Sequence, residues 1–187
     1  SLDQSMILQG ADERAFTTIV ASGPNSALPH ACPGERILQN GDLVVCDLGA
    51  VVNGYRSDMT RCKKLGENMN NLEADLLGVV LKAQEEALNM VADGVSALEV
   101  DKACRDVLDD AGLSDAFIHG TGHGVGLEIH ETPTISSLAT TTLRENQVIT
   151  IEPGVYLPGI GGVRWEDTVV VEKSSCRRLT RAPKTIN

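Results

Sequence analysis

The chain has 187 residues, 42% hydrophobic and 22% charged, which is ordinary for a soluble globular protein with one core. Its net charge of −10, without a Lys/Arg cluster, argues against a nucleic-acid partner. The five cysteines form no CxxC pair, which excludes zinc ribbons and thioredoxin-like sites. No apolar run approaches the ~20 residues of a membrane span, and no signal peptide is visible. We therefore expect a cytoplasmic protein without a membrane partner.

The first part of the chain predicts a β-hairpin. Two apolar runs, 16–21 (FTTIVA) and 43–52 (LVVCDLGAVV), indicate strands joined by a loop rich in Pro, Gly and Asn. Asn53-Gly54 then gives a strong signal for a two-residue turn, and 55–65 (YRSDMTRCKKL) is the expected return strand. Cys46, inside the second run, is expected to be a small buried hydrophobe.

Two helices are predicted in the middle of the chain. Asn70 and Glu73 have the spacing of an N-terminal capping box, and a broad apolar stripe follows them. Ser96 and Glu99 repeat this spacing at the start of the second helix. Gly112 is the expected residue just beyond the end of that helix.

A glycine-rich segment and a second hairpin complete the pattern. Residues 120–131 (GTGHGVGLEIHE) hold four glycines, which rules out a stable helix because each interior Gly costs ~1 kcal/mol relative to Ala. The runs 148–157 (VITIEPGVYL) and 161–172 (GGVRWEDTVVVE) indicate two strands around PGIGG. The order of strands, helices and strands predicts an α+β fold with antiparallel sheet, as one domain over residues 1–187.

Two aspartates on the first hairpin are candidates for a cation site. If the Asn-Gly pair forms the turn, Asp47 pairs with Thr60, and Asp58 lies diagonal to Asp47 on the same face. Asp47 shares that face with apolar residues, and two buried carboxylates are costly unless a cation compensates them. This hairpin alone leaves an alternative equally open, in which each aspartate caps a turn or pairs with Arg56 or Arg61.

The second hairpin repeats this design. Glu152 ends one apolar strand, while Arg164 and Glu166 share one face of the partner strand and Asp167 lies on the other. Taken alone, Glu152 is equally well explained as a strand-end glutamate held by Arg164. Four carboxylates at matched places on two apolar hairpins favour a shared cation site instead.

The histidines supply a nitrogen ligand for such a site. Three of the four histidines, His119, His123 and His130, fall within twelve residues. One imidazole among four carboxylates suits Mn²⁺, Co²⁺, Fe²⁺ or Zn²⁺ rather than a structural zinc. Four carboxylates exceed the charge of one divalent ion, which indicates two ions about 3.5–4 Å apart that activate a water as hydroxide. The glycines let the backbone pass close to these ions, and His130 is placed to stabilise an oxyanion.

Five segments resemble one known family in content and order. They are FTTIVASGPNSALPHA, VCDLGAVVNGYRSDMTR, HGTGHGVGLEIHE, IEPGVYLPG and GGVRWEDTVVV. Together they cover nearly the whole chain and closely resemble the pita-bread metallopeptidases, within which the chain looks like the Xaa-Pro branch of proline dipeptidases (prolidases) and aminopeptidase P. The resemblance implies the catalytic domain of that fold, in which an antiparallel sheet carries helices on its outer face.

The resemblance implies a dinuclear metal centre with all five ligands present. These ligands are Asp47, Asp58, His123, Glu152 and Glu166. Asp47 would chelate one metal, Asp58 and Glu166 would bridge, and His123 and Glu152 would complete the other. The implied cofactor is a pair of divalent ions, Mn²⁺ before Co²⁺ or Zn²⁺.

The resemblance also implies catalytic and substrate-binding side chains. Glu152 would act as general base toward the bridging water. His30, in SALPHA, and His130 would contact the scissile amide and the tetrahedral intermediate. The pocket for proline and its carboxyl side would be lined by His119, Tyr156 and Arg164.

The implied activity is hydrolysis of the bond between an N-terminal residue and a following proline. Short peptides with proline at the second position are then the expected partners, and a homodimer is expected at full length. Methionine aminopeptidases share the five ligands, but SALPHA and VRWED favour the proline-directed branch. A catalytically silent protein-binding module and a metal-free relative such as creatinase are further alternatives, which the intact ligand set disfavours.

Two departures from the family pattern stand out. Trp165 replaces a smaller aliphatic residue, and we expect it to point away from the metals and pack in the core. The opening SLDQSMILQG looks like the tail of a helix. We therefore expect a chain that begins after most opening helices of the catalytic domain and lacks the family's separate N-terminal domain.

Overall fold

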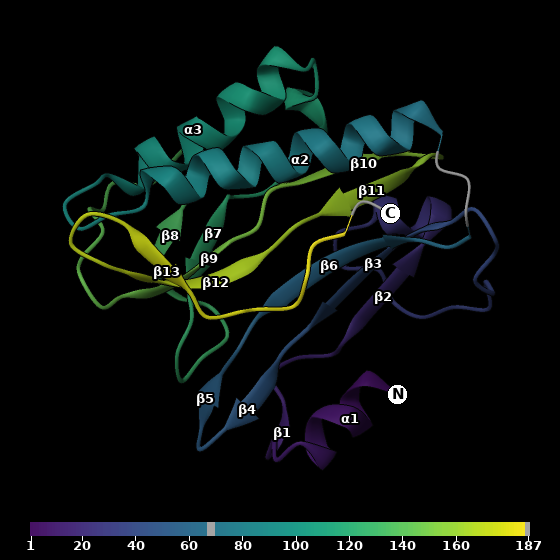
Figure 1. Cartoon of the computed structure of the whole chain (residues 1–187), viewed down its shortest axis with the longest axis horizontal. Helices are drawn as coiled ribbons and strands as arrows, with labels where there is room; N and C mark the ends of the chain where they lie inside the picture. The colour runs from purple at the N-terminus through teal and green to yellow at the C-terminus, as the bar shows by residue number, and fades with distance from the viewer. Residues whose placement is uncertain (67–69, 186–187) are drawn as a thin grey trace.

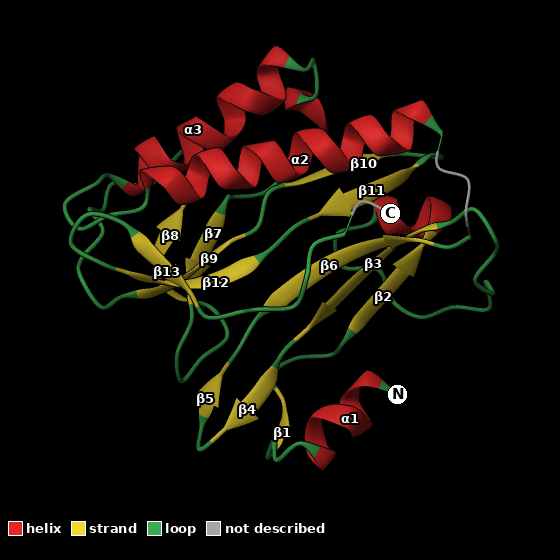
Figure 2. Ribbon diagram, viewed as in Figure 1, coloured by secondary structure: helices red, strands yellow, loops and turns green. Residues whose placement is uncertain are grey.

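Two helices lie along one side of a set of β-strands in the computed structural model, which describes residues 1–66 and 70–185 (Figures 1 and 2). These helices are α2 (Asn71–Met90) and α3 (Ala97–Asp110), and α1 (Leu2–Leu8) lies apart from them beside β1 (Glu13–Arg14). The paired strands of the described chain run antiparallel to each other. The predicted α+β class is confirmed.

The first hairpin has the predicted register. Its strands belong to two three-stranded sheets, in the orders β2-β3-β6 and β1-β4-β5. The bounds are β2 (Ile19–Ser22), β3 (Leu43–Leu48), β4 (Ala50–Val52), β5 (Tyr55–Arg56) and β6 (Met59–Lys64). Asp47 pairs with Thr60, as expected from the turn. Asn53 and Gly54 form that turn with φ values of 52° and 83°, the left-handed backbone that a tight two-residue hairpin needs.

Both arms of this hairpin are interrupted, although the sequence predicted continuous strands over 43–52 and 55–65. Gly49 separates β3 from β4, and Ser57 and Asp58 separate β5 from β6. A Cβ at Gly49 would lie 2.0 Å from the Ser57 carbonyl oxygen, so the two arms approach too closely there for a regular ladder. The pairing register is the same on both sides of the interruption.

The second hairpin also keeps one pairing register on both sides of an interruption. Ile151 pairs with Asp167 and Gly154 with Arg164, while Pro153, which has no N–H to donate, lies between the two ladders. The inner strands are β9 (Val148–Ile151), β10 (Gly154–Leu157), β11 (Gly161–Arg164) and β12 (Asp167–Val171). A five-stranded sheet of order β13-β12-β9-β7-β8 adds β7 (Gly122–Gly124), β8 (Glu131–Ile135) and β13 (Cys176–Arg178).

The two central helices begin where the sequence predicted, and the second also ends there. Asn70 and Glu73 form a reciprocal capping box at α2, and Ser96 and Glu99 form another at α3. Gly112, with φ of 70°, follows the end of α3, where its amide donates to the Asp109 carbonyl in a glycine-terminated helix end. Two short 3-10 helices, η1 (Gly23–Ala27) and η2 (Ser114–Ala116), lie in the connections.

The hydrophobic core lies between the helices and the sheets. Trp165 is fully buried there, and its indole N–H donates to the Leu77 carbonyl of α2 at 3.1 Å, so the expectation that it packs in the core is confirmed. Cys46 is only partly buried, contrary to prediction, because strand alternation turns it to the face opposite the core residue Val45. None of the helices in the described chain is both long and apolar enough to cross a membrane.

Gly122 explains why the segment before the second hairpin is rich in glycine. A Cβ at this position would lie 1.9 Å from the Thr150 carbonyl oxygen of β9. The absent side chain lets β7 lie against β9, where the Gly124–Ile149 pair joins them. The sequence analysis attributed these glycines to a close approach of the backbone to metal ions, whereas at Gly122 the close neighbour is the backbone of β9.

We predict that Gly122→Ala lowers the free energy of unfolding by about 1–3 kcal/mol, because the new methyl group overlaps the Thr150 carbonyl. The matched control is Gly78→Ala within α2, where a Cβ meets nothing within 4 Å and should stabilise the helix by up to ~1 kcal/mol. Urea unfolding of both variants measures the difference. Equal stabilities would contradict the steric explanation.

Candidate metal centre

Three of the four candidate carboxylates lie where the β-ladders are interrupted. Asp58 lies between β5 and β6, Glu152 directly follows β9, and Glu166 lies between β11 and β12. Asp47 is the exception, because it lies within β3. Side chains from both hairpins converge at these interruptions.

Asp58, His123 and Glu166 form the centre of this cluster. Each offers one ligand atom, and these three atoms lie within 4.8 Å of one another. The His123 Nε2 atom is 3.7 Å from Asp58 Oδ2 and 3.1 Å from Glu152 Oε1. The structure therefore brings together one residue of the first hairpin, one of the glycine-rich segment and two of the second hairpin.

Backbone contacts fix the orientation of His123. Its Nδ1 lies 3.0 Å from the Gly124 carbonyl oxygen, and a carbonyl can only accept, so Nδ1 carries the hydrogen. Nε2 is thereby left to face the carboxylates. The Thr150 hydroxyl accepts from the His123 amide at 3.1 Å and donates to Glu152 Oε1 at 3.3 Å. Thr150 thus fixes His123 and Glu152 relative to each other.

Asp47 is held by Arg164 at the edge of the cluster. The Arg164 Nη2 atom donates to Asp47 Oδ2 at 2.7 Å. The other carboxylate oxygen of Asp47 is buried and accepts no hydrogen bond within the described chain. The alternative in which Arg164 holds Glu152 is wrong, since the guanidinium pairs with Asp47 instead. An unsatisfied buried oxygen of this kind is available to a cation.

Thr60 is a site residue that the sequence reasoning did not single out as functional. Its hydroxyl donates to Glu166 Oε2 at 2.8 Å and accepts from Arg164 Nε at 3.1 Å. A signal for it existed, because the predicted hairpin register already placed Thr60 directly opposite Asp47. A short polar side chain across from a candidate ligand is well placed to orient the neighbouring ligands.

The cationic side chains of the first hairpin do not pair with its aspartates. Arg56 donates to the backbone carbonyls of Ala15 and Leu127. Arg61 reaches across to Asp167 at 2.8 Å. The alternative in which these arginines neutralise Asp47 and Asp58 is therefore wrong.

The opposite face of the second hairpin carries a separate ionic cluster. Asp167 points away from the candidate ligands, as the strand alternation predicted, and Lys184 Nζ lies 2.5 Å from its Oδ2 atom. Arg61 also donates to the Glu166 carbonyl oxygen at 2.5 Å. These contacts support the backbone of Glu166 from the hairpin face opposite the candidate ligands.

A second group of side chains extends from Arg164. Its Nη1 atom donates to the Tyr156 hydroxyl at 2.8 Å, and that hydroxyl lies 2.8 Å from His119 Nε2. His119 Nδ1 contacts the Gly120 carbonyl at 2.8 Å, so Nδ1 carries the hydrogen, and Tyr156 donates to Nε2 of the neutral ring. Burial lowers the pKa of His119, which favours this neutral form.

The other two histidines lie at the exposed edge of the cluster. His130 is stacked edge-on against His123, with ring centroids 4.4 Å apart. His30 is exposed in the loop after η1, and Arg164 Nη1 reaches the neighbouring Pro29 carbonyl at 3.4 Å. Burial is the main cause that lowers the pKa of His130, and the nearby rings of His123 and His30 lower it further.

Burial of like charges dominates the electrostatics. Burial raises the pKa of Asp58 to about 8, and the charges of Asp47 and Glu152 add to this effect. Burial also raises the pKa of Glu166 well above its usual range, with Asp58 as the next cause. Burial would raise the pKa of Glu152 too, but hydrogen bonding and attraction from His123 outweigh it and lower this pKa. Without an added cation, burial and repulsion therefore disfavour the ionised forms of Asp58 and Glu166.

This arrangement fits a divalent metal. The donors are carboxylate oxygens with one imidazole nitrogen, a set that suits Mn²⁺, Co²⁺, Fe²⁺ or Zn²⁺. They are buried, they approach one another within 4.8 Å, and one Asp47 oxygen has no partner. A bound cation would compensate the repulsion that raises the carboxyl pKa values.

Comparison with known proteins agrees with this geometry. The pattern of metallopeptidase family M24 matches residues 1–173. The chain belongs to metallopeptidase family M24. Within family M24, an Xaa-Pro dipeptidase from Pyrococcus furiosus is 46% identical over 181 residues, which are 97% of this chain and 52% of that protein. The chain spans about half the length of the curated relatives it matches.

Solved structures of similar proteins have the same fold. A prolidase from Pyrococcus furiosus matches with a TM-score of 0.95 and 45% identity, over 98% of this chain and 54% of that one. An X-Pro aminopeptidase from Thermotoga maritima matches with a TM-score of 0.95 and 40% identity, over 98% and 52%. The pita-bread fold that the sequence resemblance implied is confirmed.

We predict that Asp58→Asn stabilises the metal-free protein relative to the wild type, and more so at pH 8 than at pH 5. The pKa of Asp58 is about 8 in the folded state, against 3.8 for an ordinary aspartate. Between these two pH values, the folded state keeps a proton that the unfolded state has lost. Stability therefore falls as pH rises through this window, whereas the neutral amide does not titrate.

Thermal unfolding in the presence of a chelator measures this effect, and comparison at each pH cancels the titrating groups that do not interact with Asp58. Excess Mn²⁺ should reverse the order and make the wild type the more stable protein. A stability difference that is independent of pH would contradict the buried-carboxylate explanation.

Proposed function

We propose that the protein is a metal-dependent peptidase that hydrolyses the bond between an N-terminal residue and a following proline. The observation that carries this proposal is the convergence of Asp58, His123 and Glu166 within 4.8 Å in a buried site. The names of similar proteins support the substrate class, since they include Xaa-Pro dipeptidase and X-Pro aminopeptidase. Residues 1–187 are proposed to form one catalytic domain.

The proposed cofactor is a pair of divalent ions, with Mn²⁺ before Co²⁺ or Zn²⁺. Their proposed ligands are Asp47, Asp58, His123, Glu152 and Glu166. The charge balance supports two ions, because four carboxylates exceed the charge of one. When bound, such a pair polarises a carbonyl and lowers the pKa of a water molecule.

The residues of the chain then have distinct tasks. Glu152 is proposed as the general base toward the water that the ions would activate. His130 and His30 are proposed to stabilise the oxygen of the tetrahedral intermediate. Their exposure at the edge of the cluster supports this role, because a peptide reaches them from solvent.

The proline side of the substrate is proposed to bind beside His119, Tyr156 and Arg164. Arg164 is nearly fully buried, and its donors already contact Asp47, Thr60 and Tyr156. Its main contribution is therefore a fixed positive charge behind the pocket, which attracts a carboxylate on the proline side. His119 and Tyr156 form the wall that this charge supports.

The alternatives are less well supported. A methionine aminopeptidase-like activity would use the same five ligands, but several of the similar proteins are named for Xaa-Pro substrates. A catalytically silent binding module and a creatinase-like enzyme do not need the intact ligand set. We also propose a cytoplasmic location, which the five free cysteines support, and a homodimer at full length.

We predict that Asp58→Ala reduces both metal binding and activity to background. The wild type should bind about two divalent ions per chain, measured by elemental analysis after gel filtration. The matched control is Asp106→Ala on the exposed face of α3, which should retain both properties. Full metal content in the Asp58 variant would contradict its role as a ligand.

Two peptides separate the proposed activities in the protein at its natural full length. Release of proline from Ala-Pro, with Ala-Pro-Ala left intact, identifies a dipeptidase. Cleavage of Ala-Pro-Ala identifies an aminopeptidase. Efficient removal of N-terminal methionine, without cleavage of either proline peptide, would refute the proposed substrate class.

A further inference from the structure

The segment 117–121 carries His119 to the site without belonging to a helix or strand. It connects η2 with β7. A segment of this kind lacks a regular ladder, so its backbone N–H and C=O groups need other partners. Two side chains from successive turns of α3 supply several of them, Arg105 as a donor and Asp101 as an acceptor.

Arg105 holds the first half of this segment. Its Nη2 atom donates to the His119 carbonyl oxygen at 2.6 Å, and its Nη1 atom donates to the Phe117 carbonyl at 3.3 Å. The guanidinium also lies 4.3 Å from the centroid of the Phe117 ring. One planar cation thus fixes two carbonyls and one aromatic ring, a geometry that the single ammonium of Lys cannot reproduce.

Asp101 holds the second half. It is nearly fully buried, and its carboxylate accepts from the Thr121 amide at 3.1 Å and from the Thr121 hydroxyl at 2.8 Å. The Arg105 Nε atom donates to the same carboxylate at 2.7 Å. The Thr121 carbonyl in turn accepts from the Glu152 amide at 2.7 Å. Asp101 and Arg105 therefore form one ionic clamp on both sides of His119.

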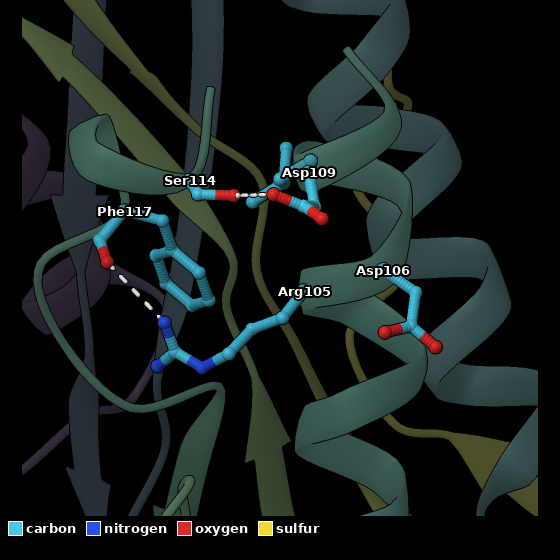
Figure 3. Close-up of a pocket in the computed structure, with 6 residues that line it drawn as sticks. Arg105, Asp106, Asp109, Ser114 and Phe117 are labelled. Carbon is cyan, nitrogen blue, oxygen red and sulfur yellow. Dashed lines mark hydrogen bonds between the residues drawn. The ribbon is translucent and has the colours of Figure 1, made fainter. Parts of the chain in front are cut away.

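A cavity of about 200 Å³ lies on the outer side of this clamp, beside α3 and η2 (Figure 3). Figure 3 shows the Arg105 side chain extending from α3 alongside the Phe117 ring, with its guanidinium directed at the Phe117 carbonyl. Ser114 closes one side of the cavity by donating to Asp109 at 2.5 Å. Because this space is open, the clamp is the main polar attachment of segment 117–121 to α3.

We propose that Asp101 and Arg105 are positioning residues that set the place and tautomer of His119 in the substrate pocket. This proposal rests on the proposed function for its kinetic consequence. Arg105 holds the His119 carbonyl, and Asp101 holds the Thr121 amide, which belongs to the same peptide plane as the Gly120 carbonyl. The Gly120 carbonyl is therefore held where His119 Nδ1–H reaches it. That contact leaves Nε2 to accept from Tyr156. Neither clamp residue contacts Asp58, His123 or Glu166.

We predict that Arg105→Met raises KM for Ala-Pro by about tenfold or more, with kcat changed far less and metal content unchanged. Methionine keeps an unbranched apolar side chain against Phe117 but donates no hydrogen bond. Arg105→Lys should give a similar KM, because one ammonium cannot hold both carbonyls. The matched control is Lys102→Met, which removes an exposed ion pair from the same helix and should leave KM unchanged.

Nitrogen NMR of His119 tests the proposal independently of activity. The wild-type ring should show a protonated Nδ1 and an unprotonated Nε2, and both Arg105 variants should shift toward a mixture of tautomers. This measurement tests the role of the clamp even if the protein cleaves no proline peptide. Failure of the proposed function can therefore be distinguished from failure of the clamp proposal. Variants that only lower the melting temperature, with the wild-type KM and tautomer, would overturn the proposal.

Discussion

The organisation of the site depends on the cost of burying several carboxylates together. Asp58 and Glu166 are buried, and burial is the main cause that raises the pKa of each. Neighbouring carboxylates add to this effect, Asp47 and Glu152 at Asp58 and Asp58 at Glu166. The chain compensates only part of this repulsion, through His123 and Arg164. Such a group is unfavourable for folding unless a cation joins it. The fold therefore accepts a local loss of stability in exchange for a preorganised set of oxygen ligands.

The rest of the structure supports this cluster from three directions. Thr60 and Thr150 orient carboxylates and the imidazole from within the sheets. Arg61 and Asp167 brace the second hairpin from its other face. The clamp on α3 holds the segment that enters the pocket. Each of these supporting groups is itself paired, so the uncompensated charge is confined to the candidate ligands.

The sequence was most informative where local chemistry determines structure. Asn53-Gly54 and two capping boxes predicted a hairpin register and two helix starts, because these signals act within a few residues. The carboxylates could be grouped because strand alternation sets their faces. The interruption at Gly49 and the short edge strand β8 were not predicted, because they depend on the close approach of paired backbones rather than on local residue preferences. The clamp was missed for the same reason, since α3 and segment 117–121 meet only through tertiary packing.

The separation of the ligands along the chain has a consequence for synthesis. Thr60 and Glu166, which share a hydrogen bond, are 106 residues apart. The first hairpin therefore leaves the ribosome long before its partner strands exist, and its aspartates remain hydrated or protonated during that interval. Long-range pairing of this kind forms late and slowly. The side chains of the candidate centre can therefore come together only after translation has passed Glu166.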